Sequence, residues 1–208
     1  MKCYQYADGM FEAVYEIKRS KFIATVYGEV DADSAEDFVK SVKKKYADAT
    51  HNCYAYISDI NGQATRFSDD GEPGGTAGQP ILQVLRKKGL VRTAVVVTRY
   101  FGGIKLGAGG LVGAYTESAV LGLESAKIST KTKCSQIAIS IDYPLYSSVE
   151  KLIWRNNWIL DGTDFLDGVC VKIWVKEDDV DSALAMIKET TLGKAVCTVS
   201  AHSQYIKN

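Results

Sequence analysis

The sequence is poor in the features that mark disordered, secreted or membrane-spanning chains. It has only three prolines in 208 residues and no serine- or glycine-rich tract, which argues against long disordered segments. No apolar run approaches the roughly 18 residues needed to cross a bilayer. Residues 1–8 also lack the apolar core of a secretion signal. We therefore expect a soluble, cytoplasmic protein.

The cysteines and the charge balance exclude further classes. The five cysteines lie far apart with no Cys-x-x-Cys pair, a pattern that predicts reduced thiols, with neither a disulfide framework nor a zinc site. Lys and Arg number 25, as do Asp and Glu, which excludes a polybasic nucleic-acid-coating protein. Residues 1–130 carry a net charge of +1 and residues 131–208 of −1. Any nucleic-acid role must therefore depend on a local patch.

What is present is an ordinary globular composition, with 46% hydrophobic and 24% charged residues. At about 150 residues per domain, the length leaves one large domain or two small ones open. Residues 127–132 are polar and without a strong pattern. We place a domain boundary there, which predicts domains over residues 1–130 and 131–208.

The first half predicts a mixture of strands and helices. Residues 11–30 alternate and are rich in β-branched side chains, which predicts a hairpin that turns near residues 19–20. A helix should follow, because Asp33 can cap it and Glu36 stands three residues on. We then expect a strand over 53–58, a loop over 68–78, a helix over 79–88, a buried strand over 94–97 and a helix ending near residue 126.

The second half has a regular plan. Strands are predicted over residues 136–143, 158–165, 169–176 and 195–205. Helices are predicted after Pro144 and over residues 179–190. This βαββαβ order is that of a ferredoxin-like domain.

The glycine-rich stretch over residues 102–110 is the most informative local feature. It lies between a buried strand and a helix start, where backbone N–H groups can converge on an anion, with Arg99 and Lys105 close by. Neither standard phosphate-binding motif fits. The stretch lacks the Gly-Lys-Ser/Thr of the Gly-x-x-x-x-Gly-Lys-Ser/Thr motif. A Gly-x-Gly-x-x-Gly motif starting at Gly107 fails, because Val112 occupies its last position. Two interpretations stay open: an anion or RNA-backbone site, or glycines that only permit tight turns and close packing.

Other chemistry is less well supported by the pattern. His51 and Cys53 share one face of a strand, and with acidic residues nearby they allow a Cys–His hydrolase to be imagined. A small buried cysteine explains the pair more simply. Asp69, Asp70 and Glu72 do not fit a calcium loop, and Asx-turn chemistry explains them better than a magnesium site. We expect no metal, no cofactor and no catalytic residue.

Several segments together resemble one known family. They are residues 16–23, 51–55, 67–73, 76–78 and 99–107, and the last includes the sequence Arg-Tyr-Phe-Gly-Gly-Ile-Lys-Leu-Gly. The chain is similar to the YigZ/IMPACT family, also called UPF0029, over about residues 12–125, and to its bacterial two-domain form. The resemblance implies an α+β protein of two domains. The first would be like the second domain of ribosomal protein S five and the fourth of elongation factor G, and the second, ferredoxin-like, like the fifth domain of that factor.

The resemblance also guides the expected function. Eukaryotic IMPACT is associated with translational control through an activator of an eIF2 kinase, a pathway that bacteria lack. Only a general association with translation or RNA therefore carries over, and the folds themselves supply analogy alone. We expect a non-enzymatic regulator that binds RNA, the ribosome or a translation-associated protein. The alternatives are an enzyme or sensor for a phosphate-bearing small molecule at the glycine-rich loop, and a protein–protein adaptor.

The candidate ligand- or RNA-binding residues are polar, aromatic and glycine positions of the first domain. They are His51, Tyr54, Asp69, Asp70, Glu72, Thr76, Arg99, Tyr100, Gly102, Gly103, Lys105, Gly107, Gly109 and Gly110. The small-molecule alternative requires that the loop over residues 68–72 meet the segment over residues 99–105 in one cleft.

Overall fold

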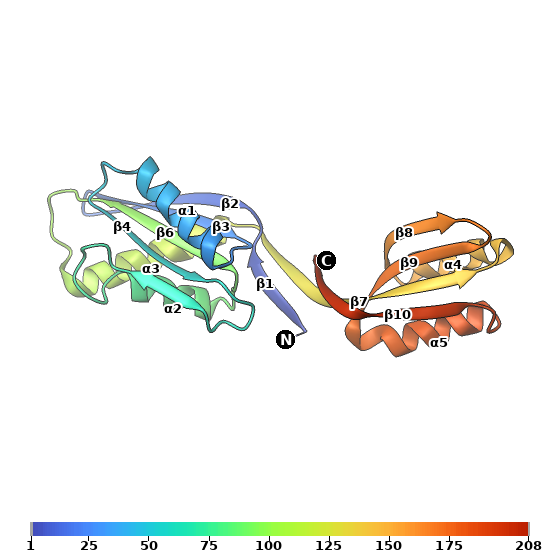
Figure 1. The fold of residues 1–208 in the computed structure, drawn as a ribbon. Coiled ribbons are helices and arrows are strands. Elements are labelled where there is room, and N and C mark those ends of the chain that lie inside the picture. Colours follow the sequence, from blue (N-terminus) through green and yellow to red (C-terminus); the bar gives the residue numbers. More distant parts are fainter. Residues whose placement is uncertain (1, 208) are drawn as a thin grey trace. The chain divides into compact units, whose positions relative to one another are not determined.

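The computed structural model describes residues 2–207, which fold as two compact units (Figure 1). Residues 3–130 form the first unit, and residues 131–207 together with Lys2 form the second. The outer ends of the two domains expected from the sequence, Met1 and Asn208, lie outside the described residues. Within residues 2–207, no helix is both long enough and apolar enough to cross a membrane.

The first unit is built on a five-stranded sheet. Its order is β2 (Met10–Ile17), β3 (Ser20–Gly28), β6 (Thr93–Tyr100), β4 (His51–Ile57) and β5 (Thr65–Ser68). Every neighbouring pair is antiparallel. The β2–β3 hairpin is confirmed, and its two-residue turn is Lys18-Arg19, both with positive φ. A tight hairpin needs such values to match the twist of its strands.

Helices cover both faces of this sheet (Figure 1). Helix α1 (Ala32–Lys45) packs on one face, against a buried cluster that includes Tyr56, Ala94 and Val96. Helices α2 (Gly78–Lys87) and α3 (Gly107–Ser125) cover the other face. A Cβ at Gly122 would lie 2.8 Å from the Cβ of Ala24 on β3, so this glycine allows α3 to lie close against the sheet.

The expected cap of α1 is wrong. Asp31 caps the helix, accepting from the Ser34 N–H at 2.9 Å, and the Ser34 hydroxyl oxygen accepts from the Asp31 N–H at 2.9 Å. This reciprocal pair satisfies two backbone donors that the alternative at Asp33 would have left open.

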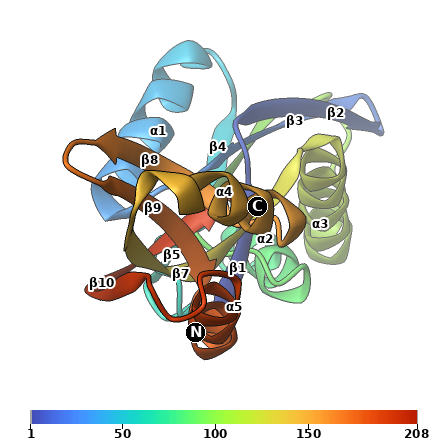
Figure 2. The same cartoon turned by 90° about the vertical axis from the view of Figure 1, so that its right-hand side faces the viewer.

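The second unit has the expected βαββαβ order (Figures 1 and 2). Its elements are β7 (Ile128–Ile141), α4 (Tyr146–Arg155), β8 (Ile159–Phe165), β9 (Val169–Lys176), α5 (Val180–Thr190) and β10 (Val196–Lys207). One-turn 3₁₀ helices, Tyr143–Leu145 and Glu177–Asp179, precede α4 and α5. The antiparallel strand order β10–β7–β9–β8 is the ferredoxin-like one, and both helices bury apolar residues in one core with the sheet.

Three strand predictions need correction. Residues 127–132, where no strand was expected and a domain boundary was placed, are mostly the start of β7. Strand β1 (Cys3–Ala7) was not expected; it pairs with β7, and the flanking Asp8 N–H donates to the Lys127 carbonyl at 2.8 Å. Strand β5 lies within residues expected to lead into a loop. Strands β1 and β5 are only five and four residues long, too short for a recognisable period, and the first residues of β7 are mostly polar.

Candidate functional site

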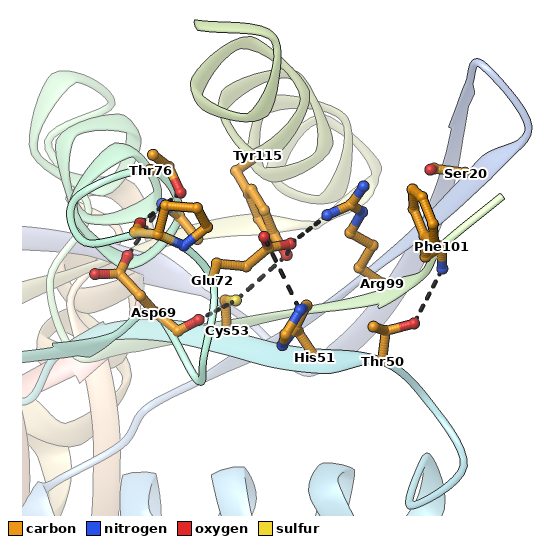
Figure 3. A network of polar contacts seen from close by, with 12 residues as sticks. Ser20, Thr50, His51, Cys53, Asp69, Glu72, Thr76, Arg99, Phe101 and Tyr115 are labelled. Carbon is orange, nitrogen blue, oxygen red and sulfur yellow. Dashed lines mark hydrogen bonds and ion pairs between the residues drawn. The ribbon is translucent and has the colours of Figure 1, made fainter. Parts of the chain in front are cut away.

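Neighbouring strands of the first unit bring three side chains into one row. Arg99 on β6 lies opposite His51 on β4 and opposite Phe22 on β3. Residues that pair across a sheet point to the same face. This row therefore lies on the face covered by α2 and α3, where Figure 3 shows the side chains of His51 and Arg99 pointing toward Tyr115 of α3.

Glu72 is the centre of a buried polar network. The loop after β5 carries its carboxylate between β6 and α3 (Figure 3). There Glu72 Oε1 accepts from Arg99 Nη1 at 2.6 Å and from the Tyr115 hydroxyl at 2.8 Å. The Glu72 and Arg99 side chains are only 3% and 6% exposed. The loop over residues 68–72 and the strand end at Arg99 thus do meet, but the two charges neutralise each other.

The guanidinium group of Arg99 has aromatic neighbours as well. Its Cζ lies 5.4 Å from the ring centre of Phe22 and 5.3 Å from that of Phe101. These distances are those of cation–π contacts. The buried Nε of Arg99 has no hydrogen-bond partner in the described part of the chain. Arg99 is therefore a buried residue, and its guanidinium group is not available at the surface, whereas the side chain of Lys105 is.

His51 and Cys53 line the same network without forming a nucleophilic pair. His51 Nδ1 lies 2.8 Å from the Asp70 carbonyl, which can only accept, so Nδ1 carries a hydrogen and Nε2 faces Glu72 Oε2 at 4.0 Å. Cys53 Sγ lies 2.9 Å from the Asp69 carbonyl. Burial raises the pKa of the Cys53 thiol to about 12. At neutral pH this thiol is protonated, and only the thiolate is an effective nucleophile.

Asp69 and Thr76 organise the loop that delivers Glu72. The Asp69 carboxylate accepts from the backbone N–H groups of Gly75, Ala77 and Gly78 at 2.8–3.0 Å. Burial opposes the charged form, but these three donors outweigh it and lower the pKa of Asp69. The buried Thr76 hydroxyl donates to the Pro73 carbonyl at 2.7 Å. Both side chains therefore stabilise the conformation of the loop through hydrogen bonds to its backbone.

Other predicted site residues point to the opposite face of the sheet. Tyr54 stacks on Tyr56 at 6.2 Å, with Lys43 of α1 over its ring. The Tyr100 hydroxyl donates to Asp48 at 2.9 Å. The Asp70 carboxylate accepts from Lys43 and from a backbone N–H of β4. Since α1 covers this face, Tyr54, Asp70 and Tyr100 do not share a site with Glu72.

One part of the glycine-rich loop after β6 packs tightly against the rest of the unit, and another part has free space around it. A Cβ at Gly102 would lie 2.0 Å from the backbone of Arg19, so the loop is seated directly on the β2–β3 turn. Gly103, Gly107 and Gly109 all face open space, and Gly103 and Gly107 also have positive φ. A Cβ at Gly110 would lie 3.1 Å from the Leu106 Cβ, in the first turn of α3.

The surface of this loop carries cations that the network does not use. Lys105 and the turn residues Lys18 and Arg19 are exposed, and none has an ion-pair partner within residues 2–207. Phe101 beside them is 45% exposed. We name these four residues, Lys18, Arg19, Phe101 and Lys105, the basic edge.

Three residues of this region were not among the candidate site residues predicted from the sequence. Tyr115 lies on the buried face of α3, at the spacing from Leu111, Ala119 and Leu123 that is typical of apolar core positions. Lys18 and Arg19 lie more than 80 residues from the glycine-rich loop, and no pattern in the chain connects them to it. Among the described residues, no cluster of three His, Cys, Asp or Glu side chains is arranged to hold a metal ion.

Comparison with known families assigns both units. Residues 18–123 match the family model described as the Impact N-terminal domain. Residues 139–194 match a second model, described as a domain of unknown function, DUF1949. The two matches fall within the first and second structural units respectively.

Relatives match over most of their length. The chain is 36% identical to IMPACT family member YvyE of Bacillus subtilis, covering 86% of this chain and 82% of that protein. It is 35% identical to IMPACT family member YigZ of Escherichia coli, covering 77% and 79%. A crystal structure titled as that of a hypothetical protein has a TM-score of 0.63 and 29% identity, covering 97% of this chain and all of the other. The chain therefore belongs to the IMPACT family.

Proposed function

We propose that this protein is a non-enzymatic, RNA-binding factor associated with translation, and that it contacts the RNA backbone through the basic edge. The observation that carries the proposal is the seating of Gly102 on the backbone of Arg19. This contact joins the β2–β3 turn, which carries Lys18 and Arg19, to the glycine-rich loop, which carries Lys105.

The charges of this surface suit a polyanion. Residues 15–22 and 99–110 contain five basic residues, of which Arg99 is paired with Glu72, and one acidic residue, Glu16. The remaining cations are exposed and can pair with phosphates, while the exposed ring of Phe101 can stack on an unpaired base. Because the first unit is otherwise nearly neutral, we expect it to bind RNA at the basic edge and not to coat RNA nonspecifically.

The interior of the site argues against an enzyme. The charges of Glu72 and Arg99 are paired with each other, and the buried thiol of Cys53 is protonated at neutral pH. A buried ion pair and a protonated thiol supply neither a free base nor a nucleophile. The association with translation is drawn from the family resemblance, including the expected likeness of the two domains to those of ribosomal protein S five and elongation factor G.

A filter-binding salt titration with ribosomal RNA and transfer RNA tests the proposal. We expect binding that weakens with salt, and we expect Lys18→Ala, Arg19→Ala and Lys105→Ala each to reduce the salt slope by about 0.7. Lys87→Ala is the matched control, because Lys87 is an exposed lysine at the end of α2. Absence of affinity at low salt, or an equal loss in the Lys87 variant, contradicts the proposal.

A further inference from the structure

The second unit contains a half-open cavity of about 340 Å³ between α4 and β8. Three aromatic side chains line it, those of Tyr146, Trp154 and Trp158, together with Glu150 and Thr163. The rest of the wall is aliphatic. A cavity of this size and composition is typical of small-ligand sites, which are mostly apolar with a few polar groups that fix orientation.

The local sequence explains how the aromatic wall is assembled. Tyr146, Glu150 and Trp154 are spaced four residues apart on α4, so they share one face of the helix. The chain then turns through Asn157, which has a φ of 52°, and the Trp158 N–H donates back to the Ile153 carbonyl at 3.1 Å. This turn returns Trp158 to the cavity.

Packing holds the ring of Tyr146 in place, but it leaves Trp154 uncovered. The ring of Phe165 on β8 meets that of Tyr146 edge-on at 5.4 Å. Trp154 is 75% exposed, although tryptophan is on average a highly buried residue. A large aromatic side chain left on the surface at the mouth of a cavity is available to a ligand.

The polar groups of the cavity are acidic or neutral. Glu150 is its one charged residue; it accepts from the Tyr146 hydroxyl at 3.2 Å and has no Lys or Arg within ion-pair distance among residues 2–207. The buried Thr163 hydroxyl makes no hydrogen bond of ordinary geometry. The faces of aromatic rings carry negative potential, so rings and carboxylate together attract a cation with an apolar shell.

We propose that the cavity between α4 and β8 binds an alkylated ammonium group, whose alkyl groups contact Tyr146, Trp154 and Trp158 and whose charge faces Glu150. An uncharged ligand would gain nothing from the Glu150 carboxylate, whereas an ammonium group can pair with it and also contact the faces of the rings. The same ammonium chemistry is found in free quaternary amines and on methylated lysine side chains. This proposal does not depend on the basic edge, which belongs to the first unit.

Isothermal titration calorimetry of the full chain tests the proposal with three probes. They are choline, its uncharged isostere 3,3-dimethylbutan-1-ol, and N-acetyl-trimethyllysine amide. We expect at least one cation to bind, and to bind at least about tenfold tighter than the neutral alcohol. The cation that binds more tightly shows whether the site prefers a free quaternary amine or a methylated lysine side chain.

Variants connect the binding to the named residues. Trp154→Ala should weaken cation binding at least about tenfold, and Glu150→Gln at least about threefold. Glu189→Gln, at an exposed carboxylate on α5 outside the cavity, should change nothing. Circular dichroism checks that the variants stay folded. Equal binding of the neutral alcohol, no binding of either cation at millimolar concentration, or full affinity in Glu150→Gln overturns the proposal.

Discussion

Glu72 and Arg99 form an ion pair almost wholly removed from water, with Nη1 and Oε1 at 2.6 Å. Burying two charges costs several kcal/mol of hydration free energy for each ion, and their mutual attraction offsets this cost only while both partners are present. The Tyr115 hydroxyl adds a further donor to the same oxygen. The pair thus ties the loop after β5 to β6 and α3, and its loss should be costly.

Removing the charge of Glu72 should strongly destabilise the protein. Glu72→Gln keeps the shape of the side chain but leaves the Arg99 charge buried without its partner. We expect the free energy of unfolding to fall by about 3–5 kcal/mol, measured by urea denaturation. Glu124→Gln is the control, since Glu124 is in a mostly exposed pair with Lys88 and should contribute at most about 1 kcal/mol. Equal effects of the two substitutions would contradict the role of burial.

Alkaline pH should destabilise the protein through Cys53. Burial raises its pKa from 9.0 to about 12, so above pH 9 the unfolded chain releases a proton that the folded one retains. The contribution to stability is complete below pH 9 and is lost as pH rises toward 12, by at most about 1.4 kcal/mol per pH unit. Thermal unfolding measured from about pH 8 to about pH 10.5 checks this prediction, because the loss of stability should begin within that range.

Two cysteine variants isolate that effect. Cys53→Ala should flatten the alkaline slope of stability, whereas Cys3→Ala, at an exposed thiol, should leave it unchanged. Burial also raises the pKa of Tyr115 in the same network, so part of the slope should remain in Cys53→Ala. An unchanged slope in that variant would show that the buried thiol does not couple to folding.

Among the helices and strands, those with a clear period in their apolar residues were predicted most accurately from the sequence. Strand β9 and helix α5 were predicted to within a residue, because their apolar positions recur at one clear period. The cap of α1 was missed because Asp31 and Asp33 both stand three residues before a polar side chain. Strands β1 and β5 are short, and a few residues carry too little periodicity to be recognised.

Gly102 should be the most restrictive glycine of the loop that connects β6 to α3. Gly102→Ala would push a Cβ to 2.0 Å from the Arg19 backbone, so the loop or the turn must move. We expect a loss of about 1–3 kcal/mol in the free energy of unfolding, together with weaker RNA binding at the basic edge.

Gly113→Ala provides the matched control for Gly102→Ala. Gly113 lies inside α3 with nothing within 4 Å of an added Cβ, so the change should stabilise the protein by up to about 1 kcal/mol. Chemical denaturation of both variants gives the comparison. A neutral Gly102→Ala would mean that the turn and the loop are not held together as described.

At the scale of the whole molecule, each unit has its own core and its own near-neutral charge. The core of the second unit is drawn from residues between Ile137 and Ile187. A neutral chain produces little long-range electrostatic field, so any recognition of a charged partner must be local. The basic edge and the cavity at α4 and β8 are two such local features, one in each unit.

The second unit should fold by itself. A fragment of residues 131–208 retains that whole core, and we expect cooperative thermal unfolding and a dispersed amide NMR spectrum. Local fraying is expected at the start of the fragment, because it lacks β1, which pairs with β7, and Lys2, whose carbonyl accepts from the Lys133 N–H. A fragment with helical content but no cooperative transition would contradict the independence of the unit.

The sequence by itself determined the division into two α+β domains, the ferredoxin-like order of the second and the family of the whole, because these depend on periodicity and on local motifs. Only the tertiary structure decided which candidate residues act together. It buried Arg99 against Glu72 and joined Arg19 to Gly102, and it placed Tyr54 and Tyr100 on the face of the sheet that α1 covers, opposite Glu72 and Arg99. Such contacts join residues far apart in the chain and depend on how strands pair and helices pack, so a short motif does not show which residues will meet.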